Sequence, residues 1–200
     1  MAQNNWPGAS VRAASVERTL KAGQALFRFG DRSVGAYEVV SGKVRLVRVD
    51  SSGREAVLFI ATAGQILGEA SLFSKTYHCD AIASGKSVVR LYRKDALLDE
   101  FRRNPQASEA FMAMLAEQVM SLRTSLEIRN IRSARERVLA YLILNAGADR
   151  RTVSLSGTVK DLAAYLGLTH ETLYRCLADM ASDGEIRRSG TTIILSGKRR

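Results

Sequence analysis

Residues 158–180 read TVKDLAAYLGLTHETLYRCLADM, and this stretch decides the fold of the carboxy-terminal part of the chain. In its first half, apolar residues recur at the spacing of one helix face: Val159, Leu162, Ala163 and Leu166. Thr158 and Asp161 are spaced to cap the start of that helix, and Gly167 stands where the helix must end in a sharp turn. Thr169 is suited to cap a second helix. The stretch therefore predicts two short helices joined by a tight turn.

The second helix is expected to have two unlike faces. At 100° per residue, its apolar side chains gather on one side: Leu173, Cys176, Leu177 and Met180. Glu171 and Arg175 project from the opposite side, one turn apart. In the major groove an arginine can pair with guanine, and a carboxylate can accept a hydrogen bond from cytosine. The spacing also fits a plain surface ion pair, but the preceding helix and turn favour DNA recognition.

A short hairpin is predicted directly after this helix. Residues 186–188 and 191–195 flank Ser189 and Gly190, which fits two short strands joined by a glycine turn. A hairpin in this place is a wing, so the segment is predicted to be a winged helix-turn-helix. The basic residues of the wing and the other polar residues of the second helix are candidate DNA contacts: Thr169, His170, Thr172, Tyr174, Arg187 and Arg188. His170 fits an exposed histidine equally well, and Tyr174 fits a side chain that shields the turn.

Composition agrees with a nucleic-acid partner without requiring one. The 200 residues include 30 basic and 20 acidic side chains, so the net charge is 30 − 20 = +10, which would also suit RNA or anionic membranes. No apolar run is long enough to span a membrane, and residues 1–10 lack the apolar core of a signal peptide. Cys79 and Cys176 cannot form a disulfide framework. We therefore expect a cytoplasmic protein that does not associate with membranes.

The amino-terminal half is predicted to be all β. Glycines recur throughout residues 17–93, and short segments of strand-forming residues lie between them: 25–29, 37–40, 43–49, 56–61 and 87–92. Ser41-Gly42 and Ser52-Gly53 are typical of hairpin turns. Many short strands at this spacing predict a closed antiparallel β-roll or jelly roll.

A long helix is expected to follow the β-roll, because Asn104 and Pro105 form a start signal. Apolar residues then step by three or four: Phe111, Leu115, Val119, Leu122 and Leu126. This narrow stripe predicts a coiled-coil seam between two chains, with a helix lying on the core of its own domain as the alternative. The pattern lapses at 130–133, a candidate hinge, and Ser133 with Glu136 predicts the start of another helix.

These elements give an α+β chain in three parts. Residues 1–103 form the β-roll, 104–131 the dimerisation helix and 132–200 the winged helix-turn-helix. This order resembles the Crp/Fnr family of bacterial transcription regulators over nearly the whole chain. Two stretches carry the likeness: GLTHETLYRCL at 167–177, and GAYEVVSGKVRLVRVDSSGREAVLFIATAGQILGEASLF at 35–73.

The resemblance implies a cyclic-nucleotide-binding-like sensor domain and a homodimer that binds a palindrome in double-stranded DNA. Glu171 and Arg175 would read a TGA-type core in each half of the palindrome. If the protein is an activator, RNA polymerase would be a further partner. The effector would lie near these residues: Gly68, Glu69, His78, Cys79, Asp80, Leu122 and Arg123.

The same resemblance disfavours cyclic AMP as the effector. Relatives that bind it place an Arg-Ser pair about ten residues after Gly-Glu, to hold the cyclic phosphate. Here Cys79-Asp80 stands in that place, a carboxylate repels a phosphate, and no cation replaces the arginine. Such relatives also have small hydroxyl residues on the dimer helix, where this chain has Leu122 and Arg123.

The cysteines and histidines allow more than one interpretation. Two distant cysteines cannot supply the four ligands of the iron–sulfur branch, but His78 or Cys79 could bind haem iron, and Cys79 could be a redox-sensitive thiol. The alternative is that His78 stabilises a loop and Cys79 packs in the core. An enzyme is not expected, because His78 and His170 are too few and too far apart for a metal centre. An adaptor that senses a ligand and acts through a protein partner is the remaining alternative class.

Overall fold

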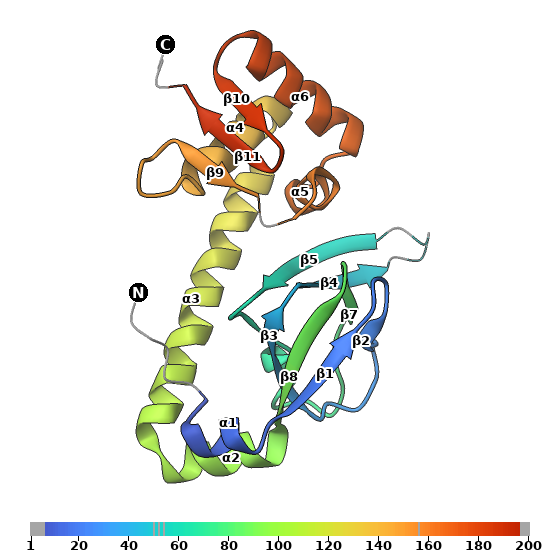
Figure 1. Cartoon of the computed structure of the whole chain (residues 1–200), viewed down its shortest axis with the longest axis vertical. Coiled ribbons are helices and arrows are strands. Elements are labelled where there is room, and N and C mark those ends of the chain that lie inside the picture. Colours follow the sequence, from blue (N-terminus) through green and yellow to red (C-terminus); the bar gives the residue numbers. More distant parts are fainter. Residues whose placement is uncertain (1–6, 50, 52, 54, 156, 197–200) are drawn as a thin grey trace. The chain divides into compact units, whose positions relative to one another are not determined.

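The computed structural model describes residues 7–49, 51, 53, 55–155 and 157–196. The chain divides into two compact units, Met1–Val119 and Met120–Arg200, and each is described by itself. The division falls inside the long helix α3, Pro105–Asn130 (Figure 1). The helix is therefore shared between the two units and does not form a separate part of the fold.

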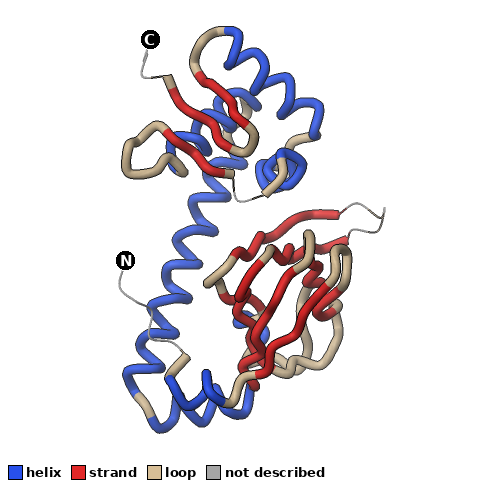
Figure 2. Tube along the Cα trace, in the orientation of Figure 1, coloured by secondary structure: helices blue, strands red, loops and turns tan. Residues whose placement is uncertain are grey.

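The first unit contains two four-stranded antiparallel sheets (Figure 2). One sheet has the order β1-β8-β3-β6, with these bounds: Val16–Leu20, Ser87–Arg93, Gly35–Ser41 and Ile66–Leu67. The other has the order β2-β7-β4-β5: Ala25–Phe27, Asp80–Ala83, Lys43–Val49 and Glu55–Thr62. Buried side chains of both sheets form one core: among them are Leu20, Val39, Val44, Leu67 and Val89. The predicted β-roll is confirmed.

One predicted turn is wrong. Ser41-Gly42 does not close a hairpin, because β3 pairs with β6 and β8 whereas β4 pairs with β5 and β7. The chain crosses from one sheet to the other at Gly42, where φ is 84° and an added Cβ would lie 2.4 Å from the Ser87 hydroxyl. β4 and β5 do pair as a hairpin, as predicted for Ser52-Gly53, although Ser52 itself lies outside the described residues.

Helices pack beside the sheets of this unit. They are α1 (Ala9–Ala13), the 3₁₀ turn η1 (Glu69–Ser71), α2 (Lys94–Arg103) and the first part of α3. Their shared core includes Val11, Leu72, Tyr92, Leu97, Phe111 and Met114.

The predicted seam on α3 is only partly exposed. Phe111 is 4% exposed and packs on Phe101 with ring centroids 4.8 Å apart, and Leu115 is half-buried against the same core. Phe111 therefore lies inside its own unit and not on a seam, because α2 covers it. Val119, Leu122 and Leu126 are 46%, 56% and 60% exposed in the single chain.

The second unit combines helices with a small sheet. Its elements are residues 120–130 of α3, α4 (Ala134–Leu144), α5 (Val159–Leu166), α6 (His170–Ser182), β9 (Thr152–Ser154), β10 (Ile186–Ser189) and β11 (Thr192–Leu195). The sheet order is β10-β11-β9. Ser133 caps α4 by accepting a hydrogen bond from the Glu136 amide at 3.3 Å, as predicted. Ile128 of α3 is 4% exposed in this unit's core.

Candidate nucleic-acid interface and effector region

Local hydrogen bonds build the turn between α5 and α6. Thr158 accepts from the Asp161 amide at 3.1 Å, and the Asp161 carboxylate accepts from the Thr158 amide at 2.9 Å, which is a complete capping box. Gly167 ends α5 with φ 65°, and Leu168 then donates to the Ala163 carbonyl at 2.8 Å. A side chain at Gly167 would be strained in this conformation, so the sharp turn depends on the glycine.

Helix α6 begins as predicted and presents two unlike faces. The Thr169 hydroxyl accepts from the Thr172 amide at 3.1 Å and bonds the Thr172 hydroxyl at 2.8 Å. Both threonines of the predicted contact set therefore serve first to cap the helix. The inner face is buried against α4 and α5: Leu173, Cys176, Leu177 and Met180.

The outer face of α6 leaves Glu171 and Arg175 exposed. Within the described part of the chain neither side chain forms a hydrogen bond or an ion pair, although they lie one turn apart. The simple surface pair that the spacing allowed is thus not made. The Glu171 carboxylate and the Arg175 guanidinium are therefore both available to bind a ligand from solution.

Tyr174 joins the wing to this helix. It is 50% exposed, its ring lies 5.3 Å from that of His170, and the Arg188 guanidinium lies over it at 5.3 Å from the centroid. Arg188 sits on β10, opposite Ile193 of β11, while Arg187 beside it is exposed. Since a cation over an aromatic face is attractive, this contact holds the wing arginine next to the outer face of α6.

The predicted effector residues of the β-roll are brought together around η1 and β7. Gly68 has φ 80° and leads into the 3₁₀ turn that carries Glu69. Glu69 is buried, which raises the pKa of its carboxyl, and its Oε2 atom has no hydrogen-bond partner among the described residues. Behind this turn, Phe27 and Tyr77 stack with ring centroids 3.8 Å apart.

The Asp80 carboxylate occupies hydrogen-bond donors that a bound anionic ligand would need. It accepts a hydrogen bond from the Phe29 amide at 2.7 Å and forms an ion pair with Arg28 at 3.0 Å. Arg48 donates to the His78 carbonyl at 2.8 Å and lies over the Phe29 ring at 4.8 Å. The expectation that no cation replaces the missing arginine is wrong, because Arg28 and Arg48, both distant in sequence, flank the segment. Arg28 is already neutralised by Asp80.

His78 and Cys79 differ in their surroundings. His78 is exposed, and its Nδ1 lies 2.9 Å from the Ser71 hydroxyl, so it stabilises the loop. Cys79 is 1% exposed in the core, and burial, followed by the charge of Asp80, raises the pKa of its thiol to about 11. Because the thiolate is both the nucleophile and the metal ligand, this environment opposes redox or haem chemistry at Cys79.

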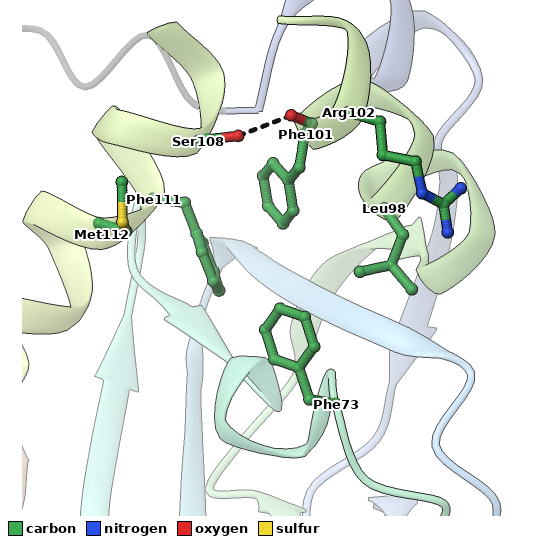
Figure 3. A pocket seen from close by; sticks show the side chains of 7 residues that line it. All are labelled: Phe73, Leu98, Phe101, Arg102, Ser108, Phe111 and Met112. Atoms are coloured by element: carbon green, nitrogen blue, oxygen red, sulfur yellow. Dashed lines mark hydrogen bonds between the residues drawn. The ribbon is translucent and has the colours of Figure 1, made fainter. Parts of the chain in front are cut away.

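Leu122 and Arg123 belong to the second unit, where both are exposed on α3. The first unit also carries a groove of about 500 Å³ that sequence analysis did not find (Figure 3). Its lining is mostly apolar: Phe73, Leu98, Phe101, Arg102, Ser108, Phe111 and Met112. Apolar residues three and four apart on α2 and α3 could have indicated it, but their convergence depends on the angle between the helices.

Comparisons with known proteins agree with this architecture. Residues 17–104 match the cyclic nucleotide-binding domain, and residues 136–199 match the Crp-like helix-turn-helix domain. The chain is 31% identical over 173 residues to the cyclic AMP receptor protein of Thermus thermophilus, covering 86% of this chain and 79% of that protein. It is 29% identical over 189 residues to the CRP-like cAMP-activated global transcriptional regulator of Mycobacterium tuberculosis, covering 89% and 83%.

A solved structure resembles the fold closely. FixK2 from Bradyrhizobium japonicum superposes with a TM-score of 0.79 at 24% identity, covering 92% of this chain and 93% of that one. Among the described residues, no helix is both long and apolar enough to cross a bilayer.

Proposed function

Because the chain belongs to the Crp/Fnr family of transcription regulators, we propose that it binds a palindromic TGA/TCA-type site in double-stranded DNA as a homodimer. The observation that carries this proposal is the outer face of α6, where Glu171 and Arg175 are exposed and form no hydrogen bond or ion pair with any described residue. A helix-turn-helix places such a face in the major groove.

Each polar residue of the interface has a separate role in this proposal. The Arg175 fork pairs with guanine O6 and N7, and Glu171 accepts from cytosine N4. Thr169 and His170 lie at the start of α6, where the helix dipole favours a phosphate. Arg187 and Arg188 contact the backbone from the wing, and Tyr174 keeps Arg188 in place.

A second copy of the chain would cover the exposed part of the α3 stripe. Val119, Leu122 and Leu126 lie at a spacing of three and four and are largely exposed in the single chain. Burying them against the same residues of a partner removes apolar surface from water. The dimer would then present two recognition helices about one DNA turn, ~34 Å, apart.

The β-roll would carry the signal, whose chemical nature stays open. The Asp80 carboxylate already takes the Arg28 and Phe29 donors, which argues against a bound cyclic phosphate at that spot. Haem ligation by His78 and redox sensing by Cys79 remain alternatives, with the burial of Cys79 against the second. The protein would act in the cytoplasm, with RNA polymerase as a partner if it activates transcription.

Fluorescence anisotropy on a labelled TTGA–TCAA palindrome and on a scrambled duplex tests the proposal. We expect Arg175→Ala to lose ~1–3 kcal/mol of specific binding and to relax the preference for its base. Arg151→Ala removes the same charge from an exposed position before β9 and serves as the control. Equal weakening on all duplexes would make Arg175 a phosphate contact. No effect of Arg175→Ala on any duplex would favour the adaptor alternative.

A further inference from the structure

The end of α5 is held by two arginines from other helices. A helix leaves its last carbonyls without intrahelical partners, and its C-terminus carries a partial negative charge. Arg129 donates from Nε to the Tyr165 carbonyl at 2.7 Å and from Nη2 to the Ala164 carbonyl at 3.3 Å. Arg137 donates from Nη1 to the Leu166 carbonyl at 3.0 Å. Three consecutive carbonyls at this end thus receive guanidinium N–H groups.

The two arginines come from either side of the linker between α3 and α4. Arg129 lies in the last turn of α3, and Arg137 lies in the first turn of α4. Arg137 also donates twice to the Ile131 carbonyl inside that linker, from Nη2 at 2.7 Å and from Nε at 3.0 Å. The linker and the turn of the helix-turn-helix are therefore tied together through one guanidinium.

Tyr165 gives the same junction a second set of contacts. Its ring lies 6.0 Å from the Arg129 guanidinium carbon and packs edge-on against Tyr141 of α4 at 5.7 Å. Its hydroxyl bonds the Ser125 hydroxyl of α3. We call Arg129, Arg137 and Tyr165 the α5 clamp.

These contacts restrict bending at the linker between α3 and α4. Residues 130–133 were predicted to be a hinge, yet the clamp spans this linker, and Ile128 of α3 is buried in the core that contains α5 and α6. The last eleven residues of α3 therefore belong to the DNA-binding unit. A flexible joint at the linker would have to break several hydrogen bonds at once.

We infer that the α5 clamp holds α3 at a fixed angle to the recognition helix and so sets the half-site spacing that the dimer accepts. This inference rests on the proposed function, because spacing has meaning only for two recognition helices on one palindrome. The clamp residues are positioning residues: Arg129 and Arg137 bind the end of α5, which carries Tyr165, whereas Glu171 and Arg175 would face the bases. Loss of the clamp should then widen the range of accepted spacings and leave the preferred half-site sequence unchanged.

The test compares binding to palindromes whose central spacer is lengthened or shortened by one and two base pairs. We expect the full-length protein to favour one spacer, and Arg129→Ala to reduce that discrimination about tenfold, since each half-site is still read by α6. Arg129→Lys keeps one donor near the helix end and should recover part of the discrimination. Arg151→Ala, which removes an exposed arginine outside the clamp, should keep all of it.

The ratio of dissociation constants between spacers is the decisive quantity. A variant that is partly unfolded loses apparent affinity on every duplex by the same factor, so the ratio does not move. An unchanged ratio in Arg129→Ala would overturn the inference. A change in the preferred bases of the half-site would overturn it as well, because the clamp would then act on base reading.

A DNA-independent measurement separates the inference from the proposed function. Spin labels at exposed Glu127 of α3 and Lys160 of α5, in labelled protein diluted with unlabelled protein, report the distance between the two helices. We expect a narrow distribution of distances in the labelled protein that keeps Arg129 and a broad one in labelled Arg129→Ala. Equal widths would refute the clamp. If the protein without substitutions does not prefer the palindrome, the proposed function fails. The widths of the two distance distributions still show whether the clamp holds α3 against α5.

Discussion

Replacing Asp80 tests whether its carboxylate stabilises the first unit by joining β7 to the residues that follow β2. The Asp80 side chain is 16% exposed and accepts a 2.7 Å hydrogen bond from the Phe29 amide. A hydrogen bond to a charged group contributes ~1.5–3 kcal/mol. The Arg28 side chain is 58% exposed, so its ion pair with Asp80 adds only ~0–1 kcal/mol. Asp80→Ala should therefore lower the free energy of unfolding by about 1.5–4 kcal/mol.

Urea denaturation followed by circular dichroism measures this loss. Asp80→Asn keeps an acceptor for the Phe29 amide but loses the charge, so it should cost about half as much as Asp80→Ala. A double-mutant cycle with Arg28→Ala should return an interaction energy of ~0–1 kcal/mol. If Asp80→Asn costs as much as Asp80→Ala, or if Asp80→Ala costs less than ~0.5 kcal/mol, then the carboxylate does not stabilise the first unit in this way.

The remaining predictions concern α3 and the buried thiol. Phe111→Ala should lower the stability of the protein by ~3–5 kcal/mol, because Phe111 is buried against Phe101. Leu126→Ala should change unfolding little and instead raise the dissociation constant of the dimer, measured by sedimentation on dilution; equal effects of both changes on dimerisation would contradict the assignment. The pKa of Cys79, raised by burial to about 11, predicts slow reaction with a disulfide reagent at neutral pH and DNA binding that is the same under oxidising and reducing conditions. Since the folded-state pKa is raised above its ordinary 9.0, the contribution of this thiol to stability is present below about pH 9 and is lost as the pH rises through about 11. Rapid modification at neutral pH would show that the thiol is accessible and ionised.

Much of the second unit could be predicted because its signals are local. Thr158, Gly167 and Thr169 each act within three or four residues of the backbone groups that they cap or turn. The same holds for the two faces of α6, since helical periodicity places Arg175 opposite Leu177 whatever surrounds the helix.

Prediction failed where the partner of a segment decides its role. Ser41-Gly42 has the composition of a hairpin turn, but pairing with distant strands makes it a crossover between sheets. The apolar stripe on α3 predicts that one face of the helix is buried, but it does not identify the element that buries it. At Phe111 that element is α2. The short strand β7 has too few residues for a pattern, and it depends on β2 and β4 for its place.

The amino-acid sequence by itself determined the fold class, the caps and turn of the helix-turn-helix, and the exposed Glu171 and Arg175 on its second helix. Only the tertiary structure decided which long-range contacts form. Arg28 meets Asp80 across 52 positions, and Arg129 meets Tyr165 across 36. Caps and helix faces depend on backbone geometry within one or two turns, so a short window of sequence contains their causes. An ion pair or a clamp depends on the packing of whole elements, and no local pattern specifies the distance between them.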